Sequence, residues 1–338
     1  MPDQLFGTGK LPAPFLQRML QQFGQSGDGV VVHPAIGVDG AVLAPGDELL
    51  VAASDPVTFA TERIGWYAVH INANDVACMG AAPRWFLATI LLPPASRGSM
   101  VSSLFERIHD ACSALGVGLV GGHTEMTAGL SRPLIVGTML GTVRREHLVT
   151  PERARVGDAV LMVKPYPIEA AALIANERAT ELVAQGWTAA EIARAQNVLF
   201  DPGLSVVEAA QIAVRTGPVH AMHDPTEGGV AGGLRELAQA TGLGILVDAD
   251  SMPQLPLGVR LCLEYDLNPM GAIASGSLLA VVPPDAVAAL LSAYEGAGIR
   301  AAEIGRLTAP GSGEWLVSGD ERMPLPTFPV DEITKLYG

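Results

Sequence analysis

The stretch His70–Thr89, HINANDVACMGAAPRWFLAT, begins with the pattern of a helix that carries several polar side chains and ends with the pattern of a strand. Asn72, Asn74 and Asp75 interrupt an otherwise apolar run whose spacing is typical of a helix. An acid and two amides are costly to bury without partners, so these three side chains are candidates for a functional site. The alternative interpretation is structural: a helix cap, or polar core groups that satisfy one another.

The sequence after this helix changes from helical spacing to a continuous apolar run. Gly80–Pro83 ends the helix, because glycine caps a helix and proline cannot continue one. We therefore expect a helix over Thr61–Met79, followed by a fully buried strand over Trp85–Leu92. Trp85 is expected to be a core residue.

The composition indicates about two domains with a large apolar core. The chain has 338 residues, 49% of them hydrophobic, and a net charge of −14 at pH 7. This length is typical of about two domains. No basic run is present, and phosphate contacts need clustered Lys and Arg, so we expect no nucleic-acid partner. The acidity fits a protein that holds cations, and equally a charge that serves solubility.

The cysteines and the hydropathy pattern indicate a cytoplasmic protein. Cys78, Cys112 and Cys262 are far apart and form no C-x-x-C pair, which favours a reducing compartment over a disulfide framework or a zinc site. Each is expected to be a small core residue. The sequence begins without a secretory signal pattern and contains no apolar run of about 18 residues, so no membrane partner is expected.

Polar residues stand where strands and glycine turns are expected. Asp39 lies between glycines, which let the backbone approach a ligand while a carboxylate reaches a metal; a simple turn aspartate is the alternative. Asp55 follows the predicted strand Glu48–Ser54, and ligands of α/β sheets bind at such strand ends. Lys10, in the segment GTGKL, would reach a phosphate from a mobile tail, or belongs to a frayed terminus.

Two further segments combine glycines with polar side chains. After a short strand at Gly118–Val120, the segment Gly121–Glu125 is expected to form a loop that offers backbone N–H groups, an imidazole, a hydroxyl and a carboxylate. His223–Val230 precedes a helix over Ala231–Ala240, and a helix N-terminus with free N–H groups is an anion site. Asp224 is either part of that site or the N-cap of the helix.

The predicted elements divide into two α/β units. Strands and helices occur on both sides of a polar, turn-rich stretch over His147–Asp158. We place the boundary at the start of this stretch, which gives domains over residues 1–146 and 147–338. The expected class is α/β, in the α+β sense of mixed sheets.

The motifs GVDGA, SDP, NANDVACMGAAPRWF, GGHTE, HDPTEGGVAGGL and ASGSLLAVV follow one another in an order that is more specific than any one of them. With them the chain resembles the family of aminoimidazole ribonucleotide (AIR) synthetase, selenophosphate synthetase, thiamine-monophosphate kinase and the hydrogenase maturation protein HypE. It is most similar to the HypE-like, AIR synthase-related branch. The resemblance implies a PurM-like two-domain fold, and a homodimer whose N-terminal sheets form a shared β-barrel. It also implies ATP in a cleft, with Mg²⁺ held by aspartates.

The resemblance also implies roles for individual residues. The implied Mg²⁺ ligands are Asp39, Asp55, Asp75 and Asp224. The implied nucleotide-binding residues are Asn72, Asn74, Gly121, Gly122, His123 and Thr124. The implied catalytic residues are Lys10, His123 and Asp224.

The sequence departs from the motifs of the family's members at several positions. HypE ends in a cysteine that carries the reacting group, whereas this sequence ends Lys335-Leu336-Tyr337-Gly338, so the usual self-modifying reaction is not expected. It has no cysteine near its start, as selenophosphate synthetases require. Val38 stands where the family often has an aspartate, and His123 stands where thiamine-monophosphate kinases usually have one.

Three functions remain open on this basis. The first is an ATP- and Mg²⁺-dependent enzyme that activates an amide, carboxylate or phosphate oxygen of a small-molecule acceptor by phosphoryl transfer. The second is a nucleotide-binding accessory protein with a partner in the maturation of a hydrogenase-type metallocentre. The third is a thiamine-monophosphate kinase.

Overall fold

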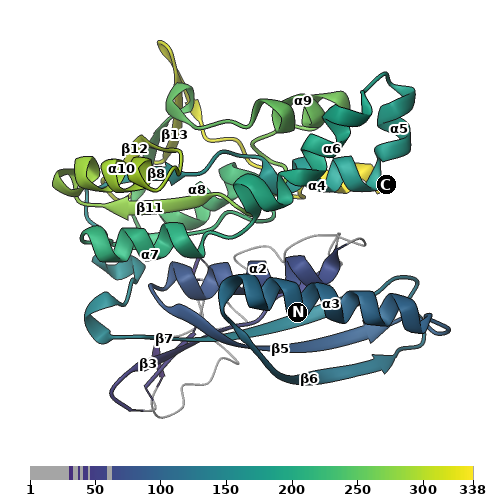
Figure 1. The fold of residues 1–338 in the computed structure, drawn as a ribbon. Coiled ribbons are helices and arrows are strands. Elements are labelled where there is room, and N and C mark those ends of the chain that lie inside the picture. Colours follow the sequence, from purple (N-terminus) through teal and green to yellow (C-terminus); the bar gives the residue numbers. More distant parts are fainter. Residues whose placement is uncertain (1–29, 33–36, 39–40, 45, 59–62, 338) are drawn as a thin grey trace, which may run out of the picture.

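The computed structural model describes residues 30–32, 37–38, 41–44, 46–58 and 63–337. Lys10 and Asp39 lie outside the described residues. The described chain forms two β-sheets, each with its own helices, one sheet from each half of the sequence (Figure 1). This is the mixed α/β architecture expected from the sequence.

The N-terminal sheet is mostly antiparallel. Its strands are β1 (Val30–Val32), β2 (Ala41–Leu43), β3 (Leu49–Ala53), β4 (Pro56–Val57), β5 (Ala82–Leu92), β6 (Gly118–Met126) and β7 (Leu134–Val143). They lie in the order β1-β2-β3-β7-β5-β6, and β4 pairs with β7 beyond the end of β3. Only the pair β5–β6 is parallel among the described strands of this sheet.

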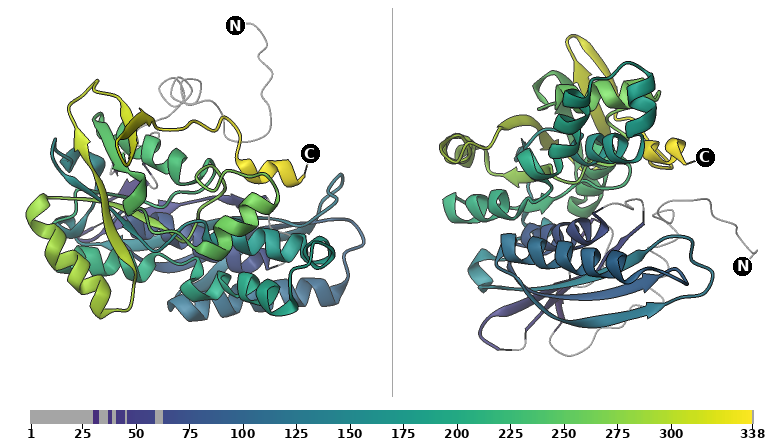
Figure 2. Two further views of the ribbon diagram at one scale, coloured as in Figure 1. Left: turned by 90° about the horizontal axis from the view of Figure 1, so that it is seen from above. Right: turned by 45° about the vertical axis from the view of Figure 1, so that its right-hand side comes forward.

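Two helices, α2 (Ile64–Cys78) and α3 (Gly98–Leu115), lie between this sheet and the C-terminal half (Figures 1 and 2). Every residue of α2 except Trp66 is buried, which is typical of a helix that is packed on all sides. The predicted helix over Thr61–Met79 is thus confirmed, with slightly shorter bounds. Its polar residues are buried as well, so each of them needs a partner.

The prediction of a fully buried strand at β5 is wrong. Phe86, Ala88 and Ile90 are buried, whereas alternate side chains are less so, and Trp85 is 39% exposed. This alternation is typical of a sheet with one covered face, and α2 and α3 cover one face only. Trp85 is therefore not a core residue.

The C-terminal sheet has the order β14-β13-β10-β12-β8-β11-β9. Its strands are β8 (Ala159–Val163), β9 (Ala221–His223), β10 (Gly244–Asp248), β11 (Leu278–Val282), β12 (Ala301–Thr308), β13 (Glu314–Ser318) and β14 (Glu321–Pro324). The adjacent strands β8 and β11 are buried at every residue, because helices pack on both faces of the sheet at this point.

The described part of this half contains seven α-helices. They are α4 (Ile168–Glu177), α5 (Ala179–Ala184), α6 (Ala189–Asn197), α7 (Val207–Thr216), α8 (Gly229–Thr241), α9 (Pro256–Glu264) and α10 (Val287–Gly296). Short 3₁₀ turns lie at Arg145–His147, Pro151–Arg153, Ala249–Ser251, Pro284–Ala286 and Glu332–Leu336, and a π-turn lies at Leu199–Gly203. None of the described helices is long and apolar enough to cross a membrane.

The two halves are joined through the backbone segment 203–206, which leads into α7. The side chain of Asn74, on α2, donates to the carbonyl oxygen of Leu204 (3.0 Å) and accepts from the amide of Val206 (2.8 Å). From the other half, Lys164 Nζ donates to the carbonyl oxygens of Gly203 (2.5 Å) and Ser205 (2.9 Å). The segment is thus held from both domains.

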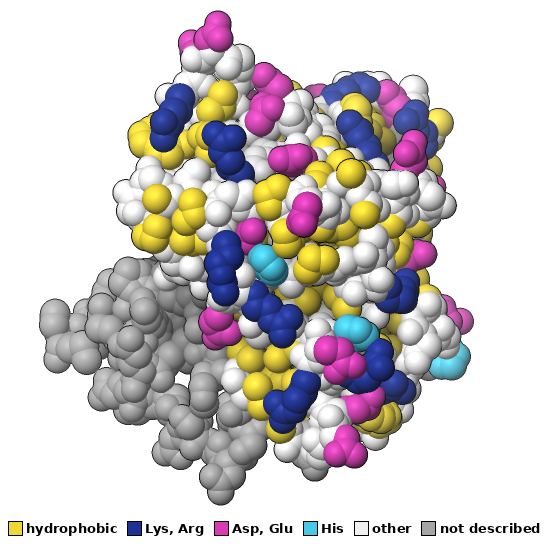
Figure 3. All heavy atoms as spheres, turned by 90° about the vertical axis from the view of Figure 1, so that its left-hand side faces the viewer, with side chains coloured by type: hydrophobic (Ala, Val, Ile, Leu, Met, Phe, Trp, Pro, Cys, Tyr) yellow, Lys and Arg dark blue, Asp and Glu magenta, His cyan; other side chains and the backbone are white. Residues whose placement is uncertain are grey.

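Acidic and basic side chains are interspersed on the face that Figure 3 shows. The expectation that no nucleic acid binds stays a prediction.

Candidate functional site

Asp55 lies in the short gap between β3 and β4, and Asn72 of α2 holds its backbone. Asn72 Oδ1 accepts a hydrogen bond from the Asp55 amide (2.8 Å), and Nδ2 donates to the Asp55 carbonyl oxygen (3.3 Å). Nδ2 also donates to the carbonyl oxygen of Ala68, one turn earlier (2.8 Å). Asn72 therefore positions the predicted metal ligand Asp55.

Both predicted amides are thus engaged with backbone groups, Asn72 with Asp55 and Asn74 with the segment before α7. This is the structural interpretation that the sequence left open for them. Direct contact of either amide with a nucleotide stays a prediction.

Asp224 directly follows β9 and is fully buried against α2. The Sγ atom of Cys78 lies 3.6 Å from Asp224 Oδ1. Cys78 is three residues after Asp75, so the two occupy neighbouring positions on the helix surface. The contact therefore brings Asp224 to the side of α2 that carries Asp75. Asp224 is not the N-cap of α8, because that position belongs to Gly228.

A cavity of about 240 Å³ lies between the two domains, next to Asp55. The N-terminal half contributes the β4 segment and Ile71 of α2, and the C-terminal half contributes the remaining wall. The lining residues are Asp55, Pro56, Val57, Thr58, Ile71, Glu169, Thr226, Glu227, Ile273 and Ser275. The structure thus brings the predicted strand-end acid together with the glycine-rich start of α8.

Glu169, in the first turn of α4, is a cavity residue that sequence reasoning missed. Its side chain is buried, and burial raises its pKa to about 7, with a further contribution from the nearby carboxylates of Asp331 and Glu227. The neighbouring Ser275 favours the ionised form and offsets part of this shift. The signal in the sequence is a lone acid in the otherwise apolar run IEAAALIA, residues 168–175.

The start of α8 already holds a carboxylate of the chain itself. The amide of Gly228 donates to Asp331 Oδ2 (2.7 Å), and Oδ1 accepts from the amides of Ile273 (3.1 Å) and Ile333 (2.8 Å). Burial raises the pKa of Asp331 to about 6 against these hydrogen bonds. The sequence predicted free N–H groups for an external anion here; Asp331 occupies the first of them.

The predicted glycine loop at Gly121–Glu125 is instead part of a strand. β6 continues through it to Met126 and pairs with β5 over its length. Gly122 has φ 142°, and a Cβ atom there would meet the Ala88 carbonyl oxygen at 2.0 Å. Only glycine lets the two strands approach this closely, which explains the residue without a loop.

Four of the six nucleotide-binding residues predicted from the resemblance line a second, separate hollow. It has about 330 Å³ and is lined by Ala88, Ile90, Phe105, Leu119, Gly121, Gly122, His123 and Thr124. His123 Nε2 lies 3.2 Å from Glu125 Oε2, and both side chains are exposed.

The strand register shows how far apart the two hollows are. The Asp55 carbonyl oxygen accepts from the amide of Gly137, which pairs with Ala88, and Ala88 pairs with Gly122. Asp55 and Gly122 therefore lie at the same level of the sheet but three strand spacings apart, or about 14 Å. The structure does not bring these two groups of predicted residues into contact.

The described residues alone do not complete a metal centre. Among them, no three His, Cys, Asp or Glu side chains are placed to hold one ion together. Mg²⁺ is ordinarily held by one or two carboxylates, with water and phosphate oxygens in its other positions. Mg²⁺ binding by Asp55, Asp75 and Asp224 therefore stays a prediction.

The inner face of α2 also carries a buried histidine. His70 stacks on Trp66 with ring centroids 4.3 Å apart, and its Nδ1 lies 2.9 Å from the Trp66 carbonyl oxygen. Burial lowers the pKa of His70 to about 4, and the nearby charge of Lys164 lowers it further, against the backbone hydrogen bond. His70 is therefore neutral at pH 7.

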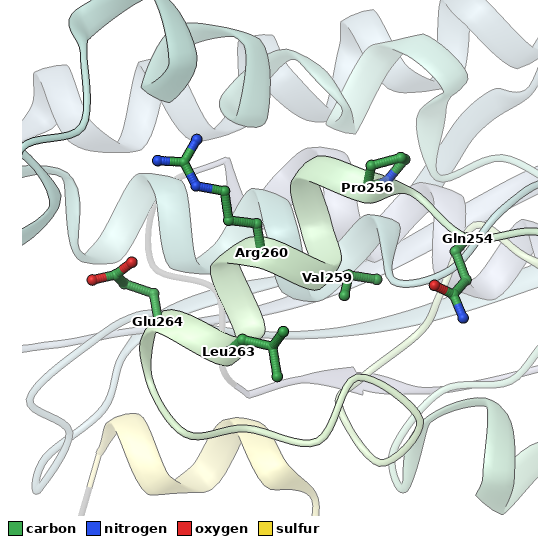
Figure 4. Close-up of a pocket in the computed structure, with 6 residues that line it drawn as sticks. All are labelled: Gln254, Pro256, Val259, Arg260, Leu263 and Glu264. Atoms are coloured by element: carbon green, nitrogen blue, oxygen red, sulfur yellow. The ribbon is translucent and has the colours of Figure 1, made fainter.

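A third hollow, on the outer side of α9, contains none of the predicted residues (Figure 4). It is lined by Gln254, Pro256, Val259, Arg260, Leu263 and Glu264. Arg260 is engaged there, because it pairs with Glu191 (2.6 Å) and its guanidinium stacks on Trp187. We therefore place the candidate site between the domains and not here.

Comparison with known proteins agrees with this geometry. Residues 37–143 match the family "AIR synthase related protein, N-terminal domain", and residues 155–317 match "AIR synthase related protein, C-terminal domain". Carbamoyl dehydratase HypE from Bradyrhizobium diazoefficiens is 29% identical over 75% of this chain and 71% of its own length.

Solved structures share the same two-domain fold. HypE in complex with ATP superimposes with a TM-score of 0.70 at 22% identity, over 97% of this chain and 98% of that one. AaThiL complexed with AMPPCP and TMP gives 0.70 at 20% identity, over 91% and 93%. The HypE–HypF complex gives 0.73 at 18% identity, over 94% and 100%. With both domains matched in order, this chain belongs to the AIR synthase-related, PurM-like family.

Proposed function

We propose that this protein is an ATP- and Mg²⁺-dependent enzyme that activates an acceptor oxygen by phosphoryl transfer, the acceptor being an amide, a carboxylate or a phosphate. The observation that carries the proposal is the interdomain cavity, where Asp55, fixed by Asn72, faces Thr226 and Glu227 across the domain boundary. ATP and AMPPCP complexes of proteins with this fold support a nucleotide as the donor.

In this proposal the chain's acids hold the metal and orient the nucleotide. Asp55, Asp75 and Asp224, with Asp39 from outside the described residues, would bind Mg²⁺. The ion would supply positive charge that stabilises the phosphoryl group during transfer. Because Asn72 fixes the backbone of Asp55, only the side chain of that residue would have to be ordered when the ligand arrives, which supplies part of the preorganisation that such catalysis needs.

We further propose that the protein acts as a homodimer. β6 is the edge strand of the N-terminal sheet, and every one of its residues is exposed. Leu119, Val120 and Met126 are among them, at 41–56% exposure. An exposed apolar edge strand invites pairing with another chain. A second copy would cover this edge and complete the hollow at Gly121–Thr124, where His123 is a proposed catalytic group.

The acceptor in this proposal is a small molecule and not a cysteine of the chain. All three cysteines are buried. Burial raises the pKa of Cys112 to about 11 and that of Cys262 to about 12, so neither thiol forms a thiolate at neutral pH.

Two alternatives have support of their own. The HypE–HypF complex favours an accessory protein that binds nucleotide and works with a maturation partner. The AaThiL complex with TMP favours a kinase that acts on a phosphate.

Nucleotide binding and turnover separate these possibilities. We would measure ATP binding by calorimetry with and without Mg²⁺, together with ADP release, for the wild type, Asp55→Asn and the exposed control Asp47→Asn. The proposal expects Mg²⁺-dependent binding that weakens at least tenfold in Asp55→Asn alone, and ADP release with an acceptor. Binding without turnover favours the accessory protein, ADP release only with thiamine monophosphate favours the kinase, and no binding refutes all three.

A further inference from the structure

The segment Asp331–Tyr337 packs against the C-terminal wall of the interdomain cavity. Ile333 is fully buried in the apolar core. The amide of Glu332 donates to the carbonyl oxygen of Gly271 (3.0 Å), and Glu332 Oε2 accepts from the amide of Asn268 (2.8 Å). The segment is therefore fixed in place, and a side chain on it can hold other parts of the wall.

Asp331 links this segment to two separate parts of the cavity wall. Its Oδ2 atom accepts from the amide of Gly228 (2.7 Å), and its Oδ1 atom accepts from the amide of Ile273 (3.1 Å). Ile273 lines the cavity itself, and Gly228 directly follows the cavity residues Thr226 and Glu227. One carboxylate thus joins two parts of the wall that are far apart in the sequence.

The turn at Thr226–Gly228 depends on this restraint because its own backbone is permissive. Gly228 and Gly229 have φ 84° and 65°, and glycine is the residue that moves most freely in and out of this region. The Thr226 carbonyl oxygen accepts from the amide of Ala274 at the long distance of 3.3 Å. Asp331 supplies the shorter, charge-assisted bond that fixes the end of the turn.

A carboxylate is more than the C-terminal segment needs for itself. Asp331 is the N-cap of the short helix Glu332–Leu336, where Oδ1 accepts from the amide of Ile333 (2.8 Å). Serine, threonine and asparagine cap helices with a single oxygen. Burial raises the pKa of Asp331 to about 6 in spite of its backbone hydrogen bonds, so keeping it ionised at pH 7 costs free energy. The second oxygen, at Gly228, accounts for a carboxylate at this position.

The opposite wall of the cavity is ordered in the same way. Asn72 holds the backbone of Asp55 through two hydrogen bonds, as Asp331 holds the amide of Gly228. Neither Asn72 nor Asp331 lines the cavity. Each wall is therefore held by a side chain behind it, which is how a site is kept rigid before its ligand arrives.

We propose that Asp331 is a positioning residue for the reaction in this cavity, and that it acts by holding the turn at Thr226–Gly228 opposite Asp55. The inference rests on the proposed function and goes beyond it, because it assigns a role to a residue outside the cavity. Asp331 acts through the turn and not by contact with the reacting atoms. Its loss therefore slows turnover and spares ATP binding, since the predicted nucleotide-binding residues belong to the N-terminal half.

Amide hydrogen exchange measured by NMR tests the hold itself, without any ligand. Asp331→Asn keeps one acceptor oxygen, which serves the amides of Ile273 and Ile333, and turns a second donor toward the Gly228 amide. Exchange at Gly228 should rise at least about tenfold, whereas the helix Glu332–Leu336 should stay within about threefold of the wild type. Asp331→Ser keeps the cap but is too short to reach Gly228, and should give the same pattern.

Asp248→Asn is the matched control. Asp248 caps the short helix Ala249–Ser251 by accepting from the amide of Asp250 (3.0 Å), and it does not line the cavity. This variant should leave both exchange at Gly228 and turnover unchanged. Melting curves check that each variant folds, and if Asp331→Asn does not, Asp331→Ser decides.

ADP release from ATP and Mg²⁺ tests what the hold does for the reaction. For Asp331→Asn we expect kcat to fall at least about tenfold while KM for ATP stays within about threefold. A residue with a merely structural role would lower the melting temperature without separating kcat from KM.

Three results would overturn the inference. Unchanged exchange at Gly228 in both variants would show that Asp331 does not hold the turn. Faster exchange with an unchanged kcat would show that the position of the turn does not matter for the reaction. An equal loss of ATP binding and turnover would place the effect on the nucleotide and not on the turn.

Failure here is distinguishable from failure of the proposed function. A wild type that releases no ADP removes the phosphoryl-transfer proposal, and with it any catalytic role of Asp331. A wild type that releases ADP at the same rate as Asp331→Asn keeps the proposed function and removes this inference alone.

Discussion

Replacement of Asn72 by alanine tests whether this side chain holds Asp55 in place. Asn72 makes three hydrogen bonds through its side chain, all to backbone groups. Two of the acceptors have other donors: the Asp55 carbonyl oxygen also accepts from the Gly137 amide, and Ala68 already accepts the regular helical bond. The Asp55 amide is the group that loses its only described partner.

The expected magnitude follows from this difference. An unpaired backbone amide costs about 1–3 kcal/mol, and Asp55 is only partly buried, so about 1–2 kcal/mol applies. The small void left by the amide group adds about 1 kcal/mol. We therefore expect Asn72→Ala to lower the free energy of unfolding by about 2–3 kcal/mol.

A matched control lies on α4. Asn176 donates to the carbonyl oxygen of Ala172 (2.8 Å), four residues earlier, in the same way as Asn72 to Ala68. It holds no other segment among the described residues, so Asn176→Ala should cost less than about 1 kcal/mol. Urea unfolding of both variants measures the two values.

The same pair of variants should differ in function. Asn72→Ala frees the Asp55 backbone and should weaken Mg²⁺-dependent ATP binding, whereas Asn176→Ala should not. If the two variants lose equal stability and bind ATP equally, the argument that Asn72 positions Asp55 is refuted.

Three further predictions concern the buried histidine and the β6 edge. His70 has a folded-state pKa of about 4, below its ordinary value of about 6.5, so between these pH values the unfolded chain binds a proton that the folded chain does not. The free energy of unfolding should therefore fall by up to about 3 kcal/mol as the pH drops from 6.5 to 4. Urea unfolding of His70→Phe should lack that loss. Gly122→Ala should lower the free energy of unfolding by at least about 2 kcal/mol, because its Cβ would clash with the β5 backbone, whereas Gly121→Ala, with its nearest contact at 3.6 Å, should be nearly neutral in thermal melts. Val120→Lys should shift the protein from dimer to monomer in sedimentation experiments, whereas Val183→Lys, equally exposed on α5, should not; a wild type that is monomeric at every concentration contradicts the dimer.

Hydrophobic periodicity predicted the long elements well. The helix predicted over Thr61–Met79 is α2, and the strand predicted over Glu48–Ser54 is β3 (Leu49–Ala53). The sequence did not predict α9, because its nine residues, PLGVRLCLE, begin with proline and contain glycine. Such a short helix is stabilised by tertiary packing more than by its own propensity.

The candidate site was predictable where it depends on local sequence, and hidden where it depends on packing. Asp55 follows a strand and Asp224 precedes a glycine-rich helix start, and both positions can be read from neighbouring residues. Glu169, Ser275 and Asp331 are more than 50 residues apart in all pairs, and only the fold buries them near one space. The glycine loop was mistaken for the opposite reason: Gly122 permits a close approach of strands, which resembles a turn signal in the sequence.

The double hold on residues 203–206 has a consequence for motion. Asn74 of α2 and Lys164, just after β8, both form hydrogen bonds with backbone groups of this segment. A hinge between the domains would have to break buried hydrogen bonds at this point, so the two walls of the cavity behave as one rigid body. Opening and closing for a ligand would then fall to short loops, such as the one at Thr226–Gly228, and not to a rotation of one domain against the other.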